Sequence, residues 1–329
     1  MTRKLRYNAV VLGVAVALAL TGCSGSDKPA DTSAGSKGLE KTTIKVGALP
    51  VPDAVSLYLA NAKGFFKEEG LTVSPVIITG GAAALPQIES GALDISMTNY
   101  VSTFLAVSTG KKIKLIADCY QAGPNTFNIM VPGDSAIKTV ADLKGKTVLV
   151  NNLHNISTLA VATQLKVAGL KETDVKFAEK PLPEMGAAIK SGQGEAGLLT
   201  EPFITATQSA SGFRKLADTM TGQMENFPIA GWMATEEWAA KYPKTLAAFQ
   251  RAISKAQQLA SSDRKQIETM LPTYTKIDAK TASVITLGSY PSELNANRLQ
   301  KVADLMLEYG YLKSAIDVKS VIAAPSSNG

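Results

Sequence analysis

An alternation of short apolar runs with helix-like segments occurs twice along this 329-residue chain, and it is the feature that most constrains the fold. Strands that alternate with helices at this spacing are typical of β–α units with parallel strands. The pattern therefore predicts an α/β fold. The runs expected as strands are 44–49, 71–79, 94–97, 112–117, 147–150, 175–178 and 196–199, and the segments expected as helices are 53–62, 82–89, 100–108, 155–168 and 184–190.

Two stretches of the chain are similar enough to indicate an internal repeat. Residues 88–94 read IESGALD, and residues 189–195, which lie 101 positions later, read IKSGQGE. A Gly-Leu pair also ends a predicted helix in each half, at 70–71 and at 169–170. Because both matches follow the same order of predicted elements, they indicate two similar lobes.

Two segments pass between the predicted lobes, 118–125 on the way out and 224–232 on the return. Two crossings mean that lobe two is inserted into lobe one and that the hinge between them has two strands. Beyond Thr235, apolar residues recur at helical spacing, which predicts C-terminal helices packed on lobe one. The expected division is lobe one at 42–122 plus 229–329, and lobe two at 123–228.

The first 22 residues have the pattern of a secretory signal peptide. A basic stub, TRKLR at 2–6, precedes twelve residues at 9–20 that are apolar apart from one glycine. A helix of twelve residues rises about 18 Å, which is too short for a bilayer core of about 30 Å. We therefore expect an export signal at 1–22 and not a membrane span.

The apolar run ends at Leu20-Thr21-Gly22-Cys23, which resembles the lipobox of bacterial lipoproteins. The resemblance implies cleavage before Cys23 and a diacylglyceryl thioether on its sulfur; the alternative is an ordinary buried cysteine. The segment 23–41 has one large apolar side chain and is expected to be a flexible tether, with the fold starting near Thr42. The other cysteine is Cys119, so a lipidated Cys23 leaves no intramolecular disulfide.

The formal charge of +6 comes from 34 basic and 28 acidic residues. Without the first 22 residues the balance is 31 against 28, a net charge of +3. A chain this close to neutral gives no electrostatic reason to expect a nucleic-acid partner. Hydrophobic residues at 45% and charged residues at 19% exclude a mainly disordered chain and predict a large core.

A ligand site is expected beyond the carboxyl ends of the strands, where loops lead into helix N-termini. Tyr120 and Trp232 lie on the predicted hinge strands, where an aromatic ring can wall the cleft between the lobes. The loop candidates for ligand binding are Asp53, Gly80, Gly81, Thr98, Asn99, Asn152, His154, Asn155 and Glu201.

Several of these candidates have a second interpretation. The Gly80-Gly81 pair lets backbone N–H groups approach an anion at a helix start, or it makes a tight turn and nothing more. Asn155 is expected to cap a helix. Glu201 and Asp53 either cap helices or accept hydrogen bonds from a ligand amine or ring N–H. For Trp232 the alternative is packing in the core.

Three stretches give a specific family resemblance. They are 57–71 (LYLANAKGFFKEEGL), 133–135 with 141–148 (GDS and ADLKGKTV), and 200–203 (TEPF). Together they resemble the nitrate/sulfonate/taurine-binding family of ABC-importer substrate-binding proteins, whose wider group includes binders of thiamine-pyrimidine precursors. The resemblance covers about 42–234, and it points to the family more than to the ligand.

The resemblance implies a two-lobed fold of the periplasmic binding protein type II. Such a protein closes on a small polar ligand and delivers it to an ABC permease that works with a cytoplasmic ATPase. It also implies an extracytoplasmic monomer, held to the cell membrane through Cys23, with no cofactor and no catalytic residues.

Arginine is missing from the predicted cleft loops. After the signal peptide it occurs at positions 214, 251, 264 and 298. We therefore expect no bidentate guanidinium clamp for a sulfonate or phosphate, which disfavours a dianion. The remaining ligand classes are a monoanion held by helix ends and amides, a zwitterion such as taurine, and a polar heterocycle recognised by Asp53 or Glu201.

Two other classes of function stay open. Fungal thiamine-pyrimidine synthases share the family's fold, and that resemblance would require pyridoxal phosphate on a lysine and a sacrificial histidine, for which His154 is available. Export and lipidation argue against a cofactor made in the cytosol, so we expect a protein that is not an enzyme. The second class is a surface sensor or adhesion lipoprotein.

His154 stands apart from other metal-binding side chains, so no metal is expected.

Overall fold

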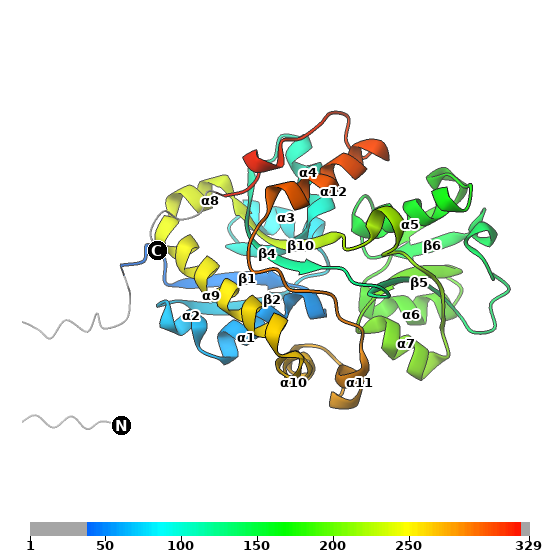
Figure 1. Ribbon diagram of the computed structural model, residues 1–329, viewed down its shortest axis with the longest axis horizontal. Helices are drawn as coiled ribbons and strands as arrows, with labels where there is room; N and C mark the ends of the chain where they lie inside the picture. The colour runs from blue at the N-terminus through cyan, green and yellow to red at the C-terminus, as the bar shows by residue number, and fades with distance from the viewer. Residues whose placement is uncertain (1–37, 324–329) are drawn as a thin grey trace, which may run out of the picture. The chain divides into compact units, whose positions relative to one another are not determined.

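The computed structural model describes residues 38–323, which belong to one compact unit. They form two five-stranded sheets with helices packed on them, so the expected two-lobed α/β architecture is confirmed (Figure 1). We call the part built on the first sheet lobe one and the part built on the second sheet lobe two. The predicted signal peptide at 1–22, Cys23 and the predicted tether up to residue 37 lie outside the described residues.

The strands of each lobe pair in an order that differs from their order in the chain. Lobe one has the order β2-β1-β3-β10-β4, and lobe two has the order β7-β6-β8-β5-β9. The strands are β1 (Thr43–Ala48), β2 (Thr72–Ile77), β3 (Ile95–Asn99), β4 (Ile113–Gln121), β5 (Phe127–Val131), β6 (Thr147–Val150), β7 (Lys176–Glu179), β8 (Ala196–Thr200), β9 (Arg214–Asp218) and β10 (Pro228–Thr235).

Helices connect these strands and cover the sheets. Within residues 38–323, no helix is both long enough and apolar enough to cross a membrane. The helices are α1 (Val55–Ala62), α2 (Phe65–Glu68), α3 (Gly81–Glu89), α4 (Tyr100–Ser108), α5 (Ile156–Val167), α6 (Leu182–Lys190), α7 (Phe203–Ser211), α8 (Glu236–Lys241), α9 (Pro243–Ser262), α10 (Arg264–Tyr274), α11 (Ala279–Val284) and α12 (Ala296–Glu308), with 3-10 turns at Pro52–Ala54, Val140–Leu143, Glu172–Asp174, Gly222–Met224 and Val318–Ser320.

The C-terminal helices pack on lobe one, as their apolar spacing predicts. Helix α9 contacts α1, α2 and β4, and α12 contacts α4 and β10. Leu246, Phe249 and Ile253 of α9 are buried at the predicted helical spacing, and the Phe249 ring stacks on Phe66 with 5.6 Å between ring centroids. Burying these side chains removes a large apolar area from water, which stabilises the lobe.

Each sheet contains antiparallel pairs in addition to the parallel β–α units that the pattern predicts. In lobe one, β10 runs antiparallel to both β3 and β4. In lobe two, β5 runs antiparallel to both β8 and β9. The sequence pattern missed β5 because it lies next to the predicted crossing segment. It missed β9, RKLAD, because this strand lies at the sheet edge and lacks an apolar run.

The two crossings between the lobes are continuous with strands of the lobe-one sheet. The first leaves from the end of β4, and the second enters β10, its neighbour in the sheet. A third segment lies beside them, since Ser289 and Gln121 exchange backbone hydrogen bonds of 2.9 and 3.0 Å. The hinge region therefore consists of the two strands expected, β4 and β10, plus one bridged segment.

Contacts with the folded body begin before the expected start at Thr42. The Glu40 carboxylate accepts hydrogen bonds from the backbone N–H groups of Lys244 and Thr245, at 3.1 and 3.0 Å. The Lys41 ammonium pairs with the Asp94 carboxylate. The last residues of the predicted tether thus belong to lobe one, because their polar side chains bind the N-terminal end of α9 and the turn before β3.

A buried ion pair joins α12 to the hinge strand β4. The Asp118 side chain is fully buried, and its carboxylate accepts hydrogen bonds from the Arg298 guanidinium and from the Tyr100 hydroxyl, the latter at 2.7 Å. Arg298 also donates to the Gln121 side chain, at 2.9 Å. Because Asp118 and Gln121 are both on β4, this cluster fixes α12 and α4 against the strand that leads into lobe two.

We predict that Arg298→Met lowers the free energy of unfolding by about 3–5 kcal/mol, because it leaves the buried Asp118 carboxylate without its cation. Urea unfolding followed by circular dichroism measures the change. The matched control is Arg251→Met, which breaks an exposed pair with Glu69 and should cost about 1 kcal/mol or less. Equal losses in the two variants would contradict the role given to Arg298.

Candidate functional site

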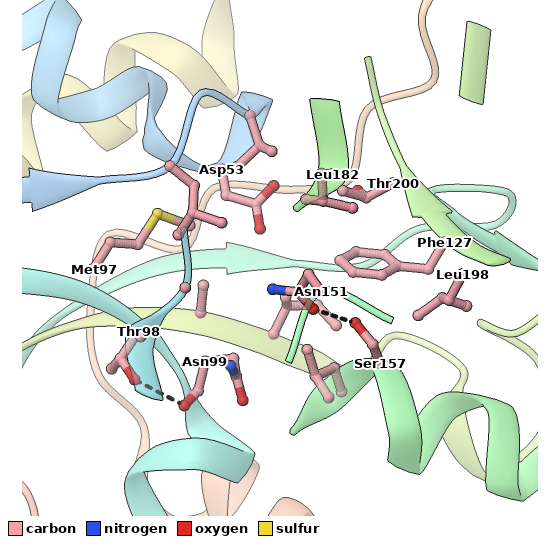
Figure 2. A pocket seen from close by; sticks show the side chains of 17 residues that line it. Asp53, Met97, Thr98, Asn99, Phe127, Asn151, Ser157, Leu182, Leu198 and Thr200 are labelled. Atoms are coloured by element: carbon pink, nitrogen blue, oxygen red, sulfur yellow. Dashed lines mark hydrogen bonds between the residues drawn. The ribbon is translucent and has the colours of Figure 1, made fainter. Parts of the chain in front are cut away.

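A pocket lies where the carboxyl ends of strands from both lobes face each other (Figure 2). Its free volume is about 50 Å³, enough for a few water-sized groups, so the lobes are close together. The lining residues are Leu49, Val51, Asp53, Gly80, Gly81, Met97, Thr98, Asn99, Ile229 and Ala230 from lobe one, and Phe127, Asn151, Ile156, Ser157, Leu182, Leu198 and Thr200 from lobe two.

Asp53 carries the ionisable side chain among the residues that line the pocket. Asp53 lies in the 3-10 turn after β1, is 4% exposed and points into the pocket (Figure 2). Its Oδ1 atom is buried without a hydrogen-bond partner. Burial raises the pKa of this carboxyl from 3.8 to about 7, because the charged form loses its hydration.

Hydrogen bonds to the backbone hold the Asp53 turn in place. The Cys119 thiol donates to the Asp53 carbonyl oxygen at 2.9 Å. The Tyr290 hydroxyl donates to the Pro52 carbonyl at 3.3 Å, and the Tyr274 hydroxyl donates to the Val51 carbonyl at 3.1 Å. These donors satisfy carbonyl groups and leave the Asp53 Oδ1 atom to the pocket.

A chain of hydrogen bonds fixes the orientation of the Asn151 amide in lobe two. Asn155 Oδ1 accepts from the backbone N–H groups of Ser157 and Thr158, at 2.8 and 3.4 Å, so its amide nitrogen faces the other way. That nitrogen donates to Asn151 Oδ1 at 2.8 Å, and the Ser157 hydroxyl donates to the same oxygen at 2.7 Å. The Asn151 NH₂ group therefore turns toward lobe one. If Gly80 carried a Cβ atom, that atom would lie 3.4 Å from Asn151 Nδ2.

The two glycines before α3 permit close approach of their neighbours. A Cβ on Gly80 would stand 1.9 Å from Asn152 Oδ1, across the cleft in lobe two. A Cβ on Gly81 would stand 2.7 Å from the Thr98 Cα. No side chain caps the N-terminus of α3. The structure thus uses both glycines for close packing, Gly80 between the lobes and Gly81 within lobe one.

Thr98 and Asn99 line the pocket, but other residues of lobe one occupy their polar atoms. The Thr98 hydroxyl bonds to the Asn99 carbonyl and the Thr103 hydroxyl, each at 3.1 Å. Asn99 caps α4: its Oδ1 accepts the Ser102 backbone N–H at 2.8 Å. Both residues shape the pocket while their side-chain hydrogen bonds point elsewhere.

Six of the sequence-predicted residues lie outside the lining. Asn152 contacts Gly80 at the edge of the pocket, and Asn155 is the buried N-cap of α5. His154 is exposed, with its ring 6.4 Å from that of Tyr311. The contact of these residues with a ligand stays a prediction.

Glu201 lies between the lobes beside the pocket. Its carboxylate accepts hydrogen bonds from the backbone and hydroxyl of Thr205, at 3.1 and 2.8 Å, and from the backbone N–H of Thr286 in lobe one, at 3.2 Å. Burial raises the pKa of Glu201. Glu201 therefore acts as a link between the lobes in this structure, closer to the capping interpretation than to contact with a ligand.

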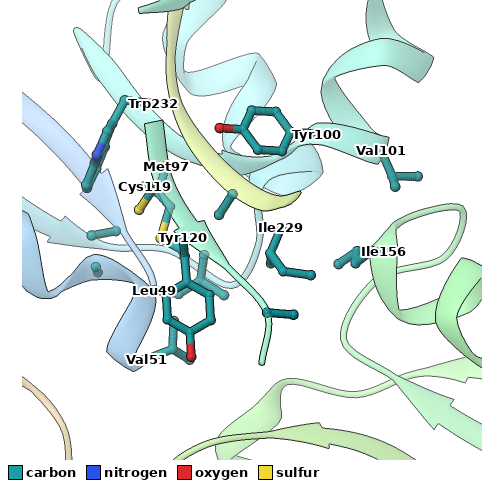
Figure 3. Packing of buried hydrophobic residues seen from close by; sticks show 14 of the residues in the cluster. Leu49, Val51, Met97, Tyr100, Val101, Cys119, Tyr120, Ile156, Ile229 and Trp232 are labelled. Carbon is teal, nitrogen blue, oxygen red and sulfur yellow. The ribbon is translucent and has the colours of Figure 1, made fainter. Parts of the chain in front are cut away.

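Tyr120 and Trp232 are buried in lobe one and do not wall the pocket (Figure 3). The Tyr120 hydroxyl accepts the Gly288 backbone N–H, and its ring meets Tyr290 edge-on with 5.3 Å between centroids. The Trp232 ring packs edge-on against Phe249 of α9, 6.0 Å away. Core packing, the alternative weighed for Trp232, is what the structure shows, because its strand turns this side chain toward α9.

The list of candidate ligand-binding residues did not include the apolar part of the lining or three polar residues, Asn151, Ser157 and Thr200. Asn151 and Thr200 follow the strand-end rule: Thr200 ends β8 as Asn99 ends β3, which is where the 101-residue repeat places a cleft residue in lobe two. Phe127 begins β5, which was not predicted. The 17 lining residues include no lysine, arginine or histidine, and residues 38–323 contain no group of three side chains suited to hold a metal ion.

Comparison with known proteins gives a consistent match to one family. The model of the NMT1/THI5-like family matches residues 51–267. The putative aliphatic sulfonates-binding protein of Escherichia coli K12 is 28% identical over 265 residues, which are 77% of this chain and 80% of that protein.

Two solved structures share the fold over most of their length. The alkanesulfonate-binding protein SsuA of Xanthomonas axonopodis pv. citri, bound to MOPS, has a TM-score of 0.72 at 19% identity, covering 86% of this chain and 99% of that one. The periplasmic nitrate-binding protein NrtA of Synechocystis PCC 6803 has a TM-score of 0.72 at 16% identity, covering 86% of this chain and 85% of that one. The chain therefore has the two-lobed periplasmic-binding-protein fold.

We predict that Asp53→Asn removes a pH-dependent loss of stability. In the wild type, the folded-state pKa of about 7 lies above the unfolded value of 3.8, so stability falls as pH rises between these values. Urea unfolding at pH 5 and pH 8 should show the variant gaining about 3 kcal/mol relative to wild type over that interval. A constant difference between the two proteins would contradict the burial of an unpaired carboxylate.

We predict that two substitutions at Asn155 differ in their effect on stability. Asn155→Ala removes the acceptor that caps α5 and should lower the free energy of unfolding by about 1–2 kcal/mol. Asn155→Ser keeps an acceptor at this position without adding a charge to a fully buried site, so its loss should be smaller. Equal losses, measured by urea unfolding at pH 8, would show that capping is not the stabilising role of this side chain.

Proposed function

Because the chain belongs to the NMT1/THI5-like family, we propose that it is the extracytoplasmic substrate-binding component of an ABC importer. It captures a small polar ligand of the sulfonate, taurine or nitrate type and delivers it to the permease. The pocket formed jointly by both lobes is the observation that carries this proposal. The names of the relatives, a sulfonates-binding protein and a nitrate-binding protein, support the ligand class.

A pocket lined from both lobes couples ligand binding to lobe closure. A ligand that touches Asp53 in lobe one and Asn151 in lobe two makes both contacts only while the lobes are together. Such a ligand shifts the population toward the closed form in proportion to its preference for that form. The permease can then distinguish loaded from empty protein by the arrangement of the lobes.

Exposed polar contacts between the lobes lie near the C-terminal end of α12. At the C-terminal end of α12, Glu308 pairs with Lys166 at 2.7 Å and accepts from Gln223 at 3.0 Å. The Tyr311 hydroxyl donates to Glu172 at 3.1 Å. The Lys166–Glu308 pair is exposed and contributes about 0–1 kcal/mol, so this pair alone does not hold the lobes together.

Attachment to the membrane is the second part of the proposal. The sequence of residues 1–23 supports export, cleavage before Cys23 and lipidation of its sulfur, and these residues lie outside those the structure describes. We propose a monomer on a tether that reaches the permease from the outer surface of the cell membrane. The proposed function involves no nucleic-acid partner.

An enzyme of the pyrimidine-synthase type fits the pocket less well. No lysine is among the lining residues to carry pyridoxal phosphate, and His154 faces Tyr311 outside the lining. The binder of a thiamine-pyrimidine precursor stays the alternative ligand class, because the free Asp53 oxygen suits a ring amine.

We predict that a compound from a panel of taurine, alkanesulfonates, nitrate, bicarbonate and aminopyrimidines stabilises and closes the chain. At 100 times its dissociation constant it should add about 2.7 kcal/mol to the free energy of unfolding, seen as a thermal shift. Small-angle scattering should show a smaller radius of gyration. Unchanged scattering at saturating ligand would refute closure.

We also predict that Glu308→Ala weakens the affinity for that compound by up to about fivefold, since it removes an exposed contact made only in the closed form. Glu225→Ala, a substitution of an exposed lobe-two residue, is the control and should leave affinity unchanged. A loss of a hundredfold or more in Glu308→Ala would mean that α12, and not the ligand, dominates closure.

A further inference from the structure

The polar groups of the pocket are unequal in what they offer a ligand. The Thr98 and Asn99 side chains are bonded within lobe one. The Thr200 hydroxyl donates to the Thr126 carbonyl at 3.0 Å, and the Ser157 hydroxyl donates to Asn151. Two polar groups of the lining side chains make no hydrogen bond to another protein group. They are the Asp53 Oδ1 acceptor and the Asn151 NH₂ donor.

The groups around Asp53 provide no positive charge for its carboxylate. Those that face it are Cys119 and Tyr120 of β4, Tyr274 of α10 and Tyr290 of the segment before α12. Burial raises the pKa of each of these thiol and hydroxyl groups, so they stay neutral. A buried carboxylate without a partner is unfavourable by several kcal/mol in general, which makes the missing partner informative.

We propose, on the basis of the proposed function, that the ligand is a small organic nitrogen compound that donates an N–H to Asp53 and accepts a hydrogen bond from the Asn151 amide. The nitrogen is an ammonium or amino group, and the acceptor is an oxygen or ring nitrogen at the opposite end. The two recognising groups come from opposite lobes, so this ligand bridges the cleft.

The rest of the lining sets the shape of this ligand. Apolar side chains line the pocket beside the two polar groups, including those of Met97, Phe127 and Leu198 (Figure 2). They favour a ligand with an apolar part, and the free volume of about 50 Å³ limits the size of that part. Nitrate and simple alkanesulfonates lack an N–H group, so they leave Asp53 without a partner. Aminosulfonates and aminopyrimidines satisfy both groups.

Matched pairs of compounds test this inference on the full chain by isothermal titration at pH 8. Taurine is compared with ethanesulfonate, and 4-amino-2-methylpyrimidine with 2,4-dimethylpyrimidine. In at least one pair, the amino compound should bind tenfold or more tightly than its amine-free partner, because a hydrogen bond to a charged group is worth about 1.5–3 kcal/mol.

The possible outcomes separate the inference from the proposed function. Amine-free compounds that bind as tightly as the amino compounds, and shrink the radius of gyration, overturn the nitrogen inference and leave the proposed function standing. Binding of none of the four compounds overturns the nitrogen inference. The proposed function is overturned as well only if nitrate, bicarbonate and the longer alkanesulfonates of the wider panel also fail to bind.

Variants locate the effect at the two polar groups. Asp53→Asn should abolish the advantage of the amino compound, and Asp134→Asn, an exposed carboxyl, should preserve it. Asn155→Asp reverses the hydrogen bond to Asn151, so the Asn151 NH₂ turns toward the new carboxylate and its oxygen turns toward the pocket. Binding should then fall tenfold or more while α5 keeps its cap. Unchanged affinity in both Asp53→Asn and Asn155→Asp overturns the inference.

The pH dependence gives an independent readout of Asp53. The affinity for the amino compound should rise about tenfold or more from pH 5.5 to pH 8 in the wild type, since the carboxylate is the form that binds the amine. The Asp53→Asn variant should show a flat profile over this range. An affinity that falls as pH rises would mean that a protonated Asp53 donates to an anion, and it would overturn the inference.

Discussion

The pairing of β4 with β10 is the interaction on which the arrangement of the lobes depends. Both crossings between the lobes are continuous with these neighbouring strands, so both connections to lobe two start from the ends of one hydrogen-bonded ladder. The Asp118–Arg298 pair fixes β4 to α12, which keeps the lobe-one side of the hinge rigid. The segments that lead into lobe two therefore start from fixed positions on the lobe-one sheet.

Periodicity predicted two α/β lobes but not strands β5 and β9, and strand ends predicted five of the 17 residues that line the pocket. Asp53, Gly80, Gly81, Thr98 and Asn99 line the pocket because parallel strands end at one edge of a sheet. The same rule was less successful in lobe two, where it selected Asn155 and Glu201, which form hydrogen bonds beside the pocket. Asn155 caps α5 and Asn151 lines the pocket. The sequence has several neighbouring asparagines here, and it does not show which of them caps the helix and which faces the pocket.

Other misses have different physical causes. Strand β9 is polar and lies at a sheet edge, so its sequence lacks the apolar run that marks a buried strand. Trp232 lies on a strand buried on both faces, where alternation gives no clue to which side faces the cleft. Tyr120 was placed on the correct hinge strand, but the Gly288 backbone occupies its hydroxyl. In each case a tertiary contact, and not local preference, decides the side chain's position.

The contact between Asn152 and Gly80 affects when a bound ligand can leave the pocket. The space beside Gly80 is filled by an amide from the other lobe, so this edge of the pocket is closed while the lobes are together. A ligand of the proposed kind can leave along this edge only after the lobes separate. Separation of the lobes then contributes to the residence time of the ligand, in addition to the strength of its individual contacts.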